Sequence, residues 1–137
     1  MRLDPLYRLT FRYRHRWEAR VADELHQLLE GEGRCEGRIS GRFHGVNRAR
    51  RRPDGAYEPD YHAVVETDDG AVLLWDLGGY GFPGEGRVLV AIKHLTSDER
   101  YGWLNRALCA ASGEVRRDDE GTAIVLDVAE LAWEPIR

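Results

Sequence analysis

The sequence lacks several features that would place it in a specialised class of protein. No apolar run is longer than five residues, the length of Val88–Ile92, which is about a quarter of what a membrane span needs. Met1–Pro5 shows no apolar core of a signal peptide. The only cysteines, Cys35 and Cys109, have neither zinc-binding nor redox-motif spacing. We therefore expect a soluble cytoplasmic protein with reduced thiols in its core and no membrane association.

Length and composition indicate one folded domain. The chain has 137 residues, of which 42% are hydrophobic and 32% are charged. This is too apolar for a disordered tail, and a chain of this length buries about two thirds of its unfolded surface. A core can therefore form without metals or disulfides. With no internal repeat visible, we predict a single domain over residues 1–137.

Lysine is almost absent, since Lys93 is the only one and all other basic residues are arginines. The chain has a net charge of −4, but its first 52 residues carry +6 and the rest −10. Arg48 and Arg50–Arg52 suggest a nucleic-acid patch. However, the chain is acidic overall and no aromatic residues interleave with this run as base-stacking platforms. We expect these arginines to be solvated or paired with acids, and no nucleic-acid partner.

The clearest periodicity lies in Leu6–Trp17, where residues alternate strictly as in a half-buried strand. One face is aromatic and the other is mostly arginine. The predicted aromatic face consists of Tyr7, Leu9, Phe11, Tyr13, His15 and Trp17.

The next segments are harder to assign. Apolar residues in Val21–Leu29 fall at helical spacing, which favours a short helix, although a strand with a bend fits as well. Arg34–Gly45 has glycine every fourth residue, typical of a tightly coiled strand, and Asn47–Gly55 reads as a loop or wide hairpin. Gly78–Gly84 reads as a flexible loop that bears aromatic residues.

Strand patterns at hairpin spacing fill the remainder of the chain, with one capped helical turn at Ser97–Arg100. The predicted strands are Tyr57–Thr67, Ala71–Leu77, Arg87–Leu95, Ala107–Val115 and Thr122–Trp133. Such a meander forms a sandwich or a closed barrel. We predict a mainly all-β fold, a single antiparallel up-and-down β-barrel of about eight strands with one or two short helices. A barrel of that size can hold one small ligand.

Several stretches resemble a bacterial family of barrels, the domain of unknown function numbered 3237. They are Leu3–Leu6, Asp60–Ala71, Arg100–Arg106 and Val125–Leu131, in the order of the family and across nearly the whole chain. The Tyr-x-Trp-Leu-Asn run within Arg100–Arg106 is the most specific part, and the sequence departs from the family pattern between Glu18 and Gly33. The resemblance implies a calycin-like barrel and no established reaction.

Acid–base chemistry requires titratable groups gathered in a cleft. The catalytic candidates are His62, Asp76 and His94, with Asp60 on the same face of its strand as His62. These residues could instead be polar side chains on the surface, or could form hydrogen bonds that only support the fold. Asp127 falls on an apolar face, so we expect it inside the barrel as a network anchor or a ligand contact.

The aromatic residues favour a ligand-binding lumen, although a solid packed core fits the same pattern. The predicted ligand-binding residues are Tyr13, Phe43, Tyr61, Tyr80, Trp103 and Asn105. Of these, Asn105 is expected to reach the lumen with its amide, and Tyr80 with Phe82 to cover the barrel mouth as a lid.

Three functional hypotheses follow. The first is a small-molecule-binding barrel that acts as a cofactor-free lyase, isomerase or cyclase on an apolar or aromatic substrate. The second is a non-catalytic carrier or sensor that uses the same lumen. The third is an interaction module with a solid core, and a homodimer is compatible with any of them. We predict no metal site, because the histidines and cysteines lack ligand spacing, and no cofactor.

Overall fold

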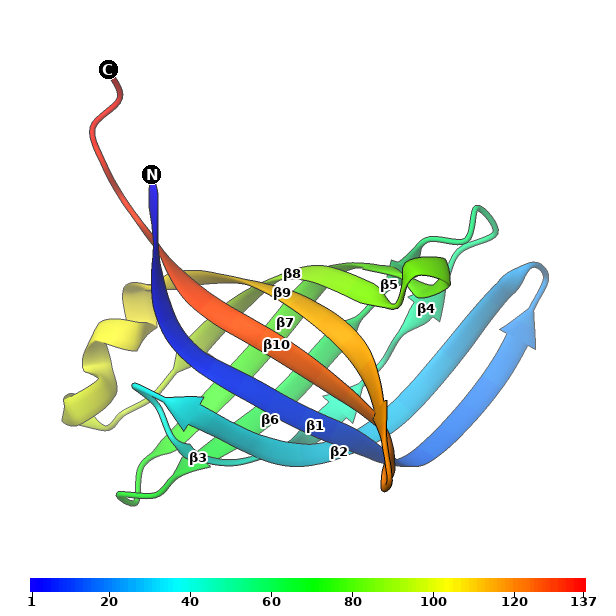
Figure 1. Cartoon of the computed structure of the whole chain (residues 1–137), viewed down its shortest axis with the longest axis horizontal. Coiled ribbons are helices and arrows are strands. Elements are labelled where there is room, and N and C mark those ends of the chain that lie inside the picture. The colour runs from blue at the N-terminus through cyan, green and yellow to red at the C-terminus, as the bar shows by residue number, and fades with distance from the viewer.

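The computed structural model describes all 137 residues and contains one antiparallel sheet of ten strands (Figure 1). The strands are β1 (Arg2–Val21), β2 (Glu24–Gly37), β3 (Gly41–Asn47), β4 (Arg50–Arg51), β5 (Tyr57–Glu58), β6 (Asp60–Thr67), β7 (Val72–Phe82), β8 (Arg87–Leu95), β9 (Leu108–Asp118) and β10 (Gly121–Ala132). Two short 3-10 helices, η1 (Pro83–Glu85) and η2 (Glu99–Arg106), connect strands. Neither helix is long and apolar enough to cross a membrane.

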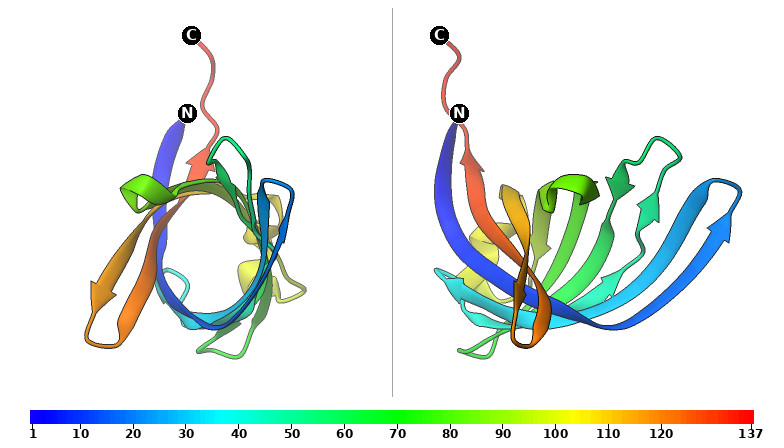
Figure 2. Two further views of the ribbon diagram at one scale, coloured as in Figure 1. Left: turned by 90° about the vertical axis from the view of Figure 1, so that its right-hand side faces the viewer. Right: turned by 45° about the vertical axis from the view of Figure 1, so that its right-hand side comes forward.

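The eight long strands close into a ring. Strand β1 pairs with β2 on one side and with β10 on the other, and β3 pairs with β6. The ring runs β1, β2, β3, β6, β7, β8, β9, β10 and back to β1, and Figure 2 shows it end-on. Strands β4 and β5 bridge β2 and β7 at one end. The predicted antiparallel up-and-down barrel is therefore confirmed.

One end of the ring, here called the floor, is closed by η2 and a solid core. The side chain of Leu104 from η2 is fully buried in that core. Helix η2 begins after Asp98, whose carboxylate accepts a hydrogen bond from the Arg100 backbone N–H. Asp98 is thus the N-cap, one residue after the predicted Ser97.

Of the two alternatives for Val21–Leu29, the short helix is wrong, and the segment is strand with a turn in it. Strand β1 turns at Ala22–Asp23 and returns as β2, with Val21 opposite Glu24 and Trp17 opposite Leu28. The cross-strand ladder satisfies the backbone, so tertiary pairing overrides the helical spacing of a few leucines. This hairpin projects beyond the ring at the end opposite η2, here called the mouth (Figure 2).

A β-bulge in β1 changes which side chains face the lumen. Tyr13 lies opposite Gly31, but His15 lies opposite Glu30, so Arg14 is an extra residue. One inserted residue exchanges the two faces of a strand. The predicted aromatic face therefore ends at Tyr13. Beyond the bulge His15 and Trp17 stack on the outside, and Arg16 lines the cavity instead.

Two glycine-rich segments also differ from expectation. The segment Arg34–Gly45 is not one strand, because a turn at Arg38–Ser40 separates β2 from β3. The expected loop at Gly78–Gly84 is mostly strand, since β7 continues to Phe82 and pairs with β8 along that length. By contrast, the loop or wide hairpin expected over Asn47–Gly55 is confirmed as a hairpin, because β4 pairs with β5 across the turn at Arg52–Ala56.

Candidate functional site

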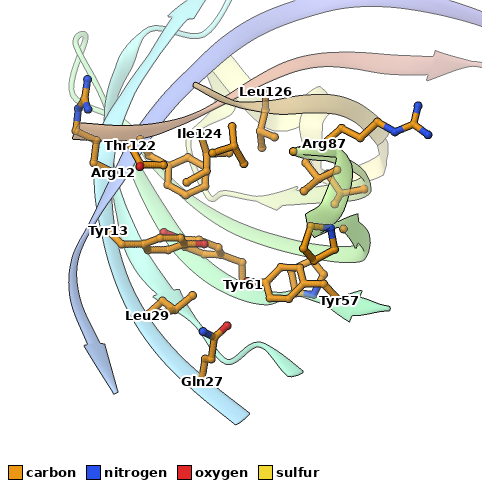
Figure 3. Close-up of a pocket in the computed structure, with 18 of the residues that line it drawn as sticks. Arg12, Tyr13, Gln27, Leu29, Tyr57, Tyr61, Arg87, Thr122, Ile124 and Leu126 are labelled. Carbon is orange, nitrogen blue, oxygen red and sulfur yellow. The ribbon is translucent and has the colours of Figure 1, made fainter. Parts of the chain in front are cut away.

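A cavity of about 440 Å³ occupies the lumen at the mouth, and Figure 3 shows its lining. Most of its wall is apolar and comes from strands on all sides of the ring. These side chains are Phe11, Leu29, Leu77, Val88, Val90, Val115, Ile124 and Leu126. A largely apolar cavity of this size is typical of a binding site for one small molecule.

Tyrosine rings form the bottom of the cavity. Tyr13 from β1 and Tyr61 from β6 stack with ring centroids 6.4 Å apart, and Phe11 meets both rings edge-on. The Tyr61 hydroxyl is buried without a hydrogen-bond partner beside Gly31, where any Cβ would clash with it. Burial raises the pKa of Tyr61. The sequence signal for this arrangement is Gly31, because only a residue without a side chain leaves room for the Tyr61 hydroxyl.

Asn47 organises two tyrosine hydroxyls at the cavity wall. Its buried side-chain amide donates to the hydroxyls of Tyr13 and Tyr57, at 3.0 Å each. Its side-chain oxygen accepts from the Asp60 backbone N–H at 3.0 Å. Burial raises the pKa of both Tyr13 and Tyr57, so both are neutral phenols near pH 7. The two hydroxyls also interact, and this contact raises the pKa of Tyr13 and lowers that of Tyr57, so Tyr13 acts as the donor and Tyr57 keeps its hydroxyl hydrogen available.

The rim of the cavity is rich in arginine. Five arginines and one glutamate line it: Arg12, Arg14, Arg16, Arg51, Arg87 and Glu120. The uncharged polar side chains there are Gln27 and Thr122, besides the tyrosines. The rim lining therefore includes more positive than negative side chains, in a chain whose net charge is −4.

Below the cavity, the floor contains a buried hydrogen-bonded network. The Trp75 indole N–H donates to the Tyr7 hydroxyl at 2.9 Å, and that hydroxyl lies 2.7 Å from Nε2 of His94. If Tyr7 donates to Nε2, the His94 proton lies on Nδ1, which is buried without a hydrogen-bond partner. Burial lowers the pKa of His94 to about 4, so the imidazole is neutral.

The predicted catalytic residues do not meet in one place. Nδ1 of His62 lies 2.7 Å from Asp76, and its Nε2 lies 3.0 Å from Asp60. All three side chains are about 65% exposed on the outer wall, on the opposite side of the sheet from His94. Asp76, and next Asp60, raise the pKa of His62. His62 does lie beside Asp60 as predicted, and Asp76 joins them, but these residues are surface polar groups, so the catalytic site expected in the lumen does not include them.

The predicted ligand-binding residues also divide between inside and outside. Tyr13 and Tyr61 line the cavity, and Phe43 is fully buried beneath them against Trp75. Tyr80 faces outward from β7, and Trp103 lies on the surface under the guanidinium of Arg38. Neither contributes to the lumen, although Phe82 does line the mouth.

Asn105 and Asp127 correct two further expectations. Asn105 hydrogen-bonds the backbone N–H and C=O of Thr96, so it fastens η2 to the end of β8 and does not reach the lumen. Asp127 accepts from Arg8 at 2.7 Å on the outer face. Its strand places Ile124 and Leu126 inward, and the alternation carries Asp127 outward.

Both cysteines are free thiols buried in the barrel. Burial raises the pKa of Cys35 to about 12 and that of Cys109 to about 11, so both are inert thiols. No group of three or more histidine, cysteine or acidic side chains is positioned to hold a metal ion.

Sequence reasoning missed four residues that line the cavity, namely Arg16, Gln27, Arg51 and Tyr57, and also Asn47, which holds two of its tyrosine hydroxyls. The position of Arg16 could not be predicted because of the bulge. Strict alternation from Tyr7 assigns Arg16 to the outer face. Asn47 and Arg51 fall in a segment whose turn residues dominate its pattern. Only Tyr57 carries a local signal, as an aromatic residue at the start of a predicted strand.

The sequence matches no family model and no curated protein. Solved structures do match. A beta-barrel like protein from Acinetobacter baumannii AYE has 23% identity and a TM-score of 0.80, covering 96% of each chain. A Clostridium acetobutylicum protein of unknown function has 16% identity and a TM-score of 0.82, covering 96% of this chain and all of that one. An enzyme from Penicillium herquei has 23% identity and a TM-score of 0.73, covering 93% of each chain. This chain shares their fold.

Proposed function

We propose that the barrel binds a small molecule with an apolar or aromatic body in its lumen. The observation that carries this proposal is the 440 Å³ cavity, with an aromatic bottom, an apolar wall and a rim rich in arginine. A solid interaction module would have packed this volume, because protein interiors are close-packed. The lumen therefore favours ligand binding over the solid-core hypothesis.

Turnover of the bound molecule is the second candidate function. The hydroxyls of Tyr13 and Tyr57 are neutral, oriented by Asn47, and adjacent to the cavity. A neutral hydroxyl donor such as that of Tyr57 stabilises an oxyanion that develops during a lyase, isomerase or cyclase step. The Penicillium herquei neighbour is described as an enzyme, which is a reason to test for turnover. Binding without turnover would make the protein a carrier or sensor.

Native mass spectrometry of the protein purified from its own host tests the proposal. We expect a co-purifying small molecule that is released on denaturation. Incubating the released molecule with fresh protein and following it by chromatography then distinguishes an enzyme from a carrier.

Two neighbouring substitutions locate the bound molecule. Val88 lines the cavity, whereas the next residue, Leu89, points outward and is 60% exposed. Val88→Trp should fill the lumen and abolish the bound species, and Leu89→Trp should retain it. Equal occupancy in both variants, or a ligand-free mass in the native protein, would contradict binding in the lumen.

A further inference from the structure

Two arginines at the cavity mouth are less neutralised than the other three. Three of the five form close ion pairs with acidic side chains. Arg12 pairs with Asp118 and Glu120. Arg14 pairs with Glu32, and Arg87 pairs with Glu85. Arg51 makes no ion pair. The nearest carboxylate oxygen to Arg16 belongs to Glu18 at 3.7 Å, and that oxygen already accepts from Gln27 at 2.8 Å.

Strand alternation explains the orientation of Arg51. In the run Arg50–Arg52, Arg50 and Arg52 both pair with Glu58, at 3.1 and 2.9 Å. Arg51, between them, lines the cavity and lies opposite Tyr57 in the β4–β5 ladder. The run that resembles a nucleic-acid patch thus consists of two ion-paired arginines and one arginine that lines the cavity.

Arg16 reaches the same part of the mouth from the other side of β2. The bulge at Arg14 brings it opposite Leu29, whose side chain lines the cavity. The charges of Arg16 and Arg51 both act to lower the pKa of Tyr57, against the larger effect of burial. Arg16, Arg51 and Tyr57 all line this cavity, and Arg51 lies opposite Tyr57 in the β4–β5 ladder, so both arginines share the cavity mouth with the Tyr57 side chain.

We propose that the ligand carries a carboxylate or similar oxyanion, bound at the mouth by Arg16 and Arg51 while its apolar body fills the lumen. This inference rests on the proposed function, because it specifies the ligand of the same cavity. A guanidinium group donates two parallel hydrogen bonds to such an anion. The neutral Tyr57 hydroxyl supplies a further donor beside them.

Two fluorescent probes of nearly equal shape separate the inference from the proposed function. One is 8-anilinonaphthalene-1-sulfonate, and the other is N-phenyl-1-naphthylamine, which lacks the sulfonate. We expect the native protein to bind both, and Val88→Trp to bind neither. We expect the double variant Arg16→Gln/Arg51→Gln to bind the sulfonate about tenfold more weakly and the neutral probe unchanged.

The matched control is Arg42→Gln/Arg106→Gln, which removes the same charge from residues that do not line the cavity. It should leave both affinities as they are in the native protein. If the Arg16/Arg51 variant binds both probes like the native protein, the anion site is refuted and lumen binding stands. If the native protein binds neither probe, the proposed function fails and the inference with it. Carboxylates and phosphates of one aryl body, used as competitors, then identify the preferred anion.

Discussion

The floor and the mouth of this barrel are built from the same strands but are filled differently. At the floor, the inward side chains are large, and Trp75, Phe43 and Tyr61 pack together with centroids 4.9 to 5.5 Å apart. Toward the mouth, the buried positions of β7 after Trp75 are Leu77 and Gly81. Strand β8 follows the same trend, from His94 through Ile92 to Val90 and Val88. The cavity results from this decrease in side-chain size along the strands.

The two ends also differ in how far their polar groups are hydrogen-bonded or ion-paired within the protein. At the floor, Trp75, Tyr7 and His94 hydrogen-bond one another and leave only Nδ1 of His94 without a partner. At the mouth, Arg51 has no acidic partner and the neutral Tyr57 has a hydroxyl hydrogen to donate. The floor therefore serves stability, and the mouth has unused donors for a ligand.

The largest expected effect tests the floor. Trp75→Ala removes a fully buried ring and its hydrogen bond to Tyr7, and should lower the free energy of unfolding by about 3–5 kcal/mol. Trp17→Ala is the matched control, because Trp17 lies outside the barrel and is 52% exposed. It should change stability by less than about 0.5 kcal/mol in urea denaturation. If both variants lost a similar amount of stability, the solid core at the floor would be contradicted. The bulge would be contradicted as well, because it is the bulge that places Trp17 outside the barrel.

The second prediction concerns pH and the same floor. Because burial lowers the pKa of His94 to about 4, the unfolded chain binds a proton between pH 6.5 and 4 that the folded chain does not. The contribution of His94 is therefore complete above pH 6.5 and is lost as pH falls toward 4. At pH 4.5 the loss should be about 2–3 kcal/mol.

His94→Gln removes this titration and should make stability depend less on pH in that range. Urea denaturation of both proteins at pH 7 and pH 4.5 measures the difference. An identical pH dependence in the variant would show that His94 is not buried as a neutral group.

Much of the fold could be predicted from the sequence, because period-two alternation and Asp-Asp-Gly turns are local signals. The outline of the barrel and the inward positions of Tyr13, Tyr61 and His94 follow from them. The composition of the mouth could not be predicted. One extra residue at Arg14 reverses the faces of β1, and no local pattern marks where a bulge will form.

The errors at Asp127 and Asn105 have a different cause. Alternation tells which residues share a face of a strand, but not which face is buried when both carry apolar residues. On β10, Val125 and Leu126 are both buried although they point to opposite sides. The orientation of Asn105 depends on how η2 docks, which is a tertiary contact with Thr96.

The third prediction compares two asparagines. Asn47→Ala leaves the Asp60 N–H without its partner and releases Tyr13 and Tyr57, so it should cost about 1–2 kcal/mol of stability. It should also weaken N-phenyl-1-naphthylamine binding, because the cavity wall loses its support. Asn105→Ala, at the opposite end, should leave probe affinity unchanged. Weaker probe binding in Asn105→Ala alone would restore the original assignment of that residue to the ligand site.

The smallest effects are expected on the outer wall, at His62 and Asp76. Their side chains are exposed on the far side of the sheet from the cavity, so His62→Gln and Asp76→Asn should not change probe affinity. Since Asp76 raises the pKa of His62, Asp76→Asn should lower that pKa in an NMR titration. The accompanying stabilisation is present below pH 6.5 and disappears as pH rises through the raised pKa, and solvent screening keeps it small. A large loss of probe binding or turnover in either variant would contradict this prediction. It would show that His62 and Asp76 belong to the active site and that this site lies on the outer wall of the barrel.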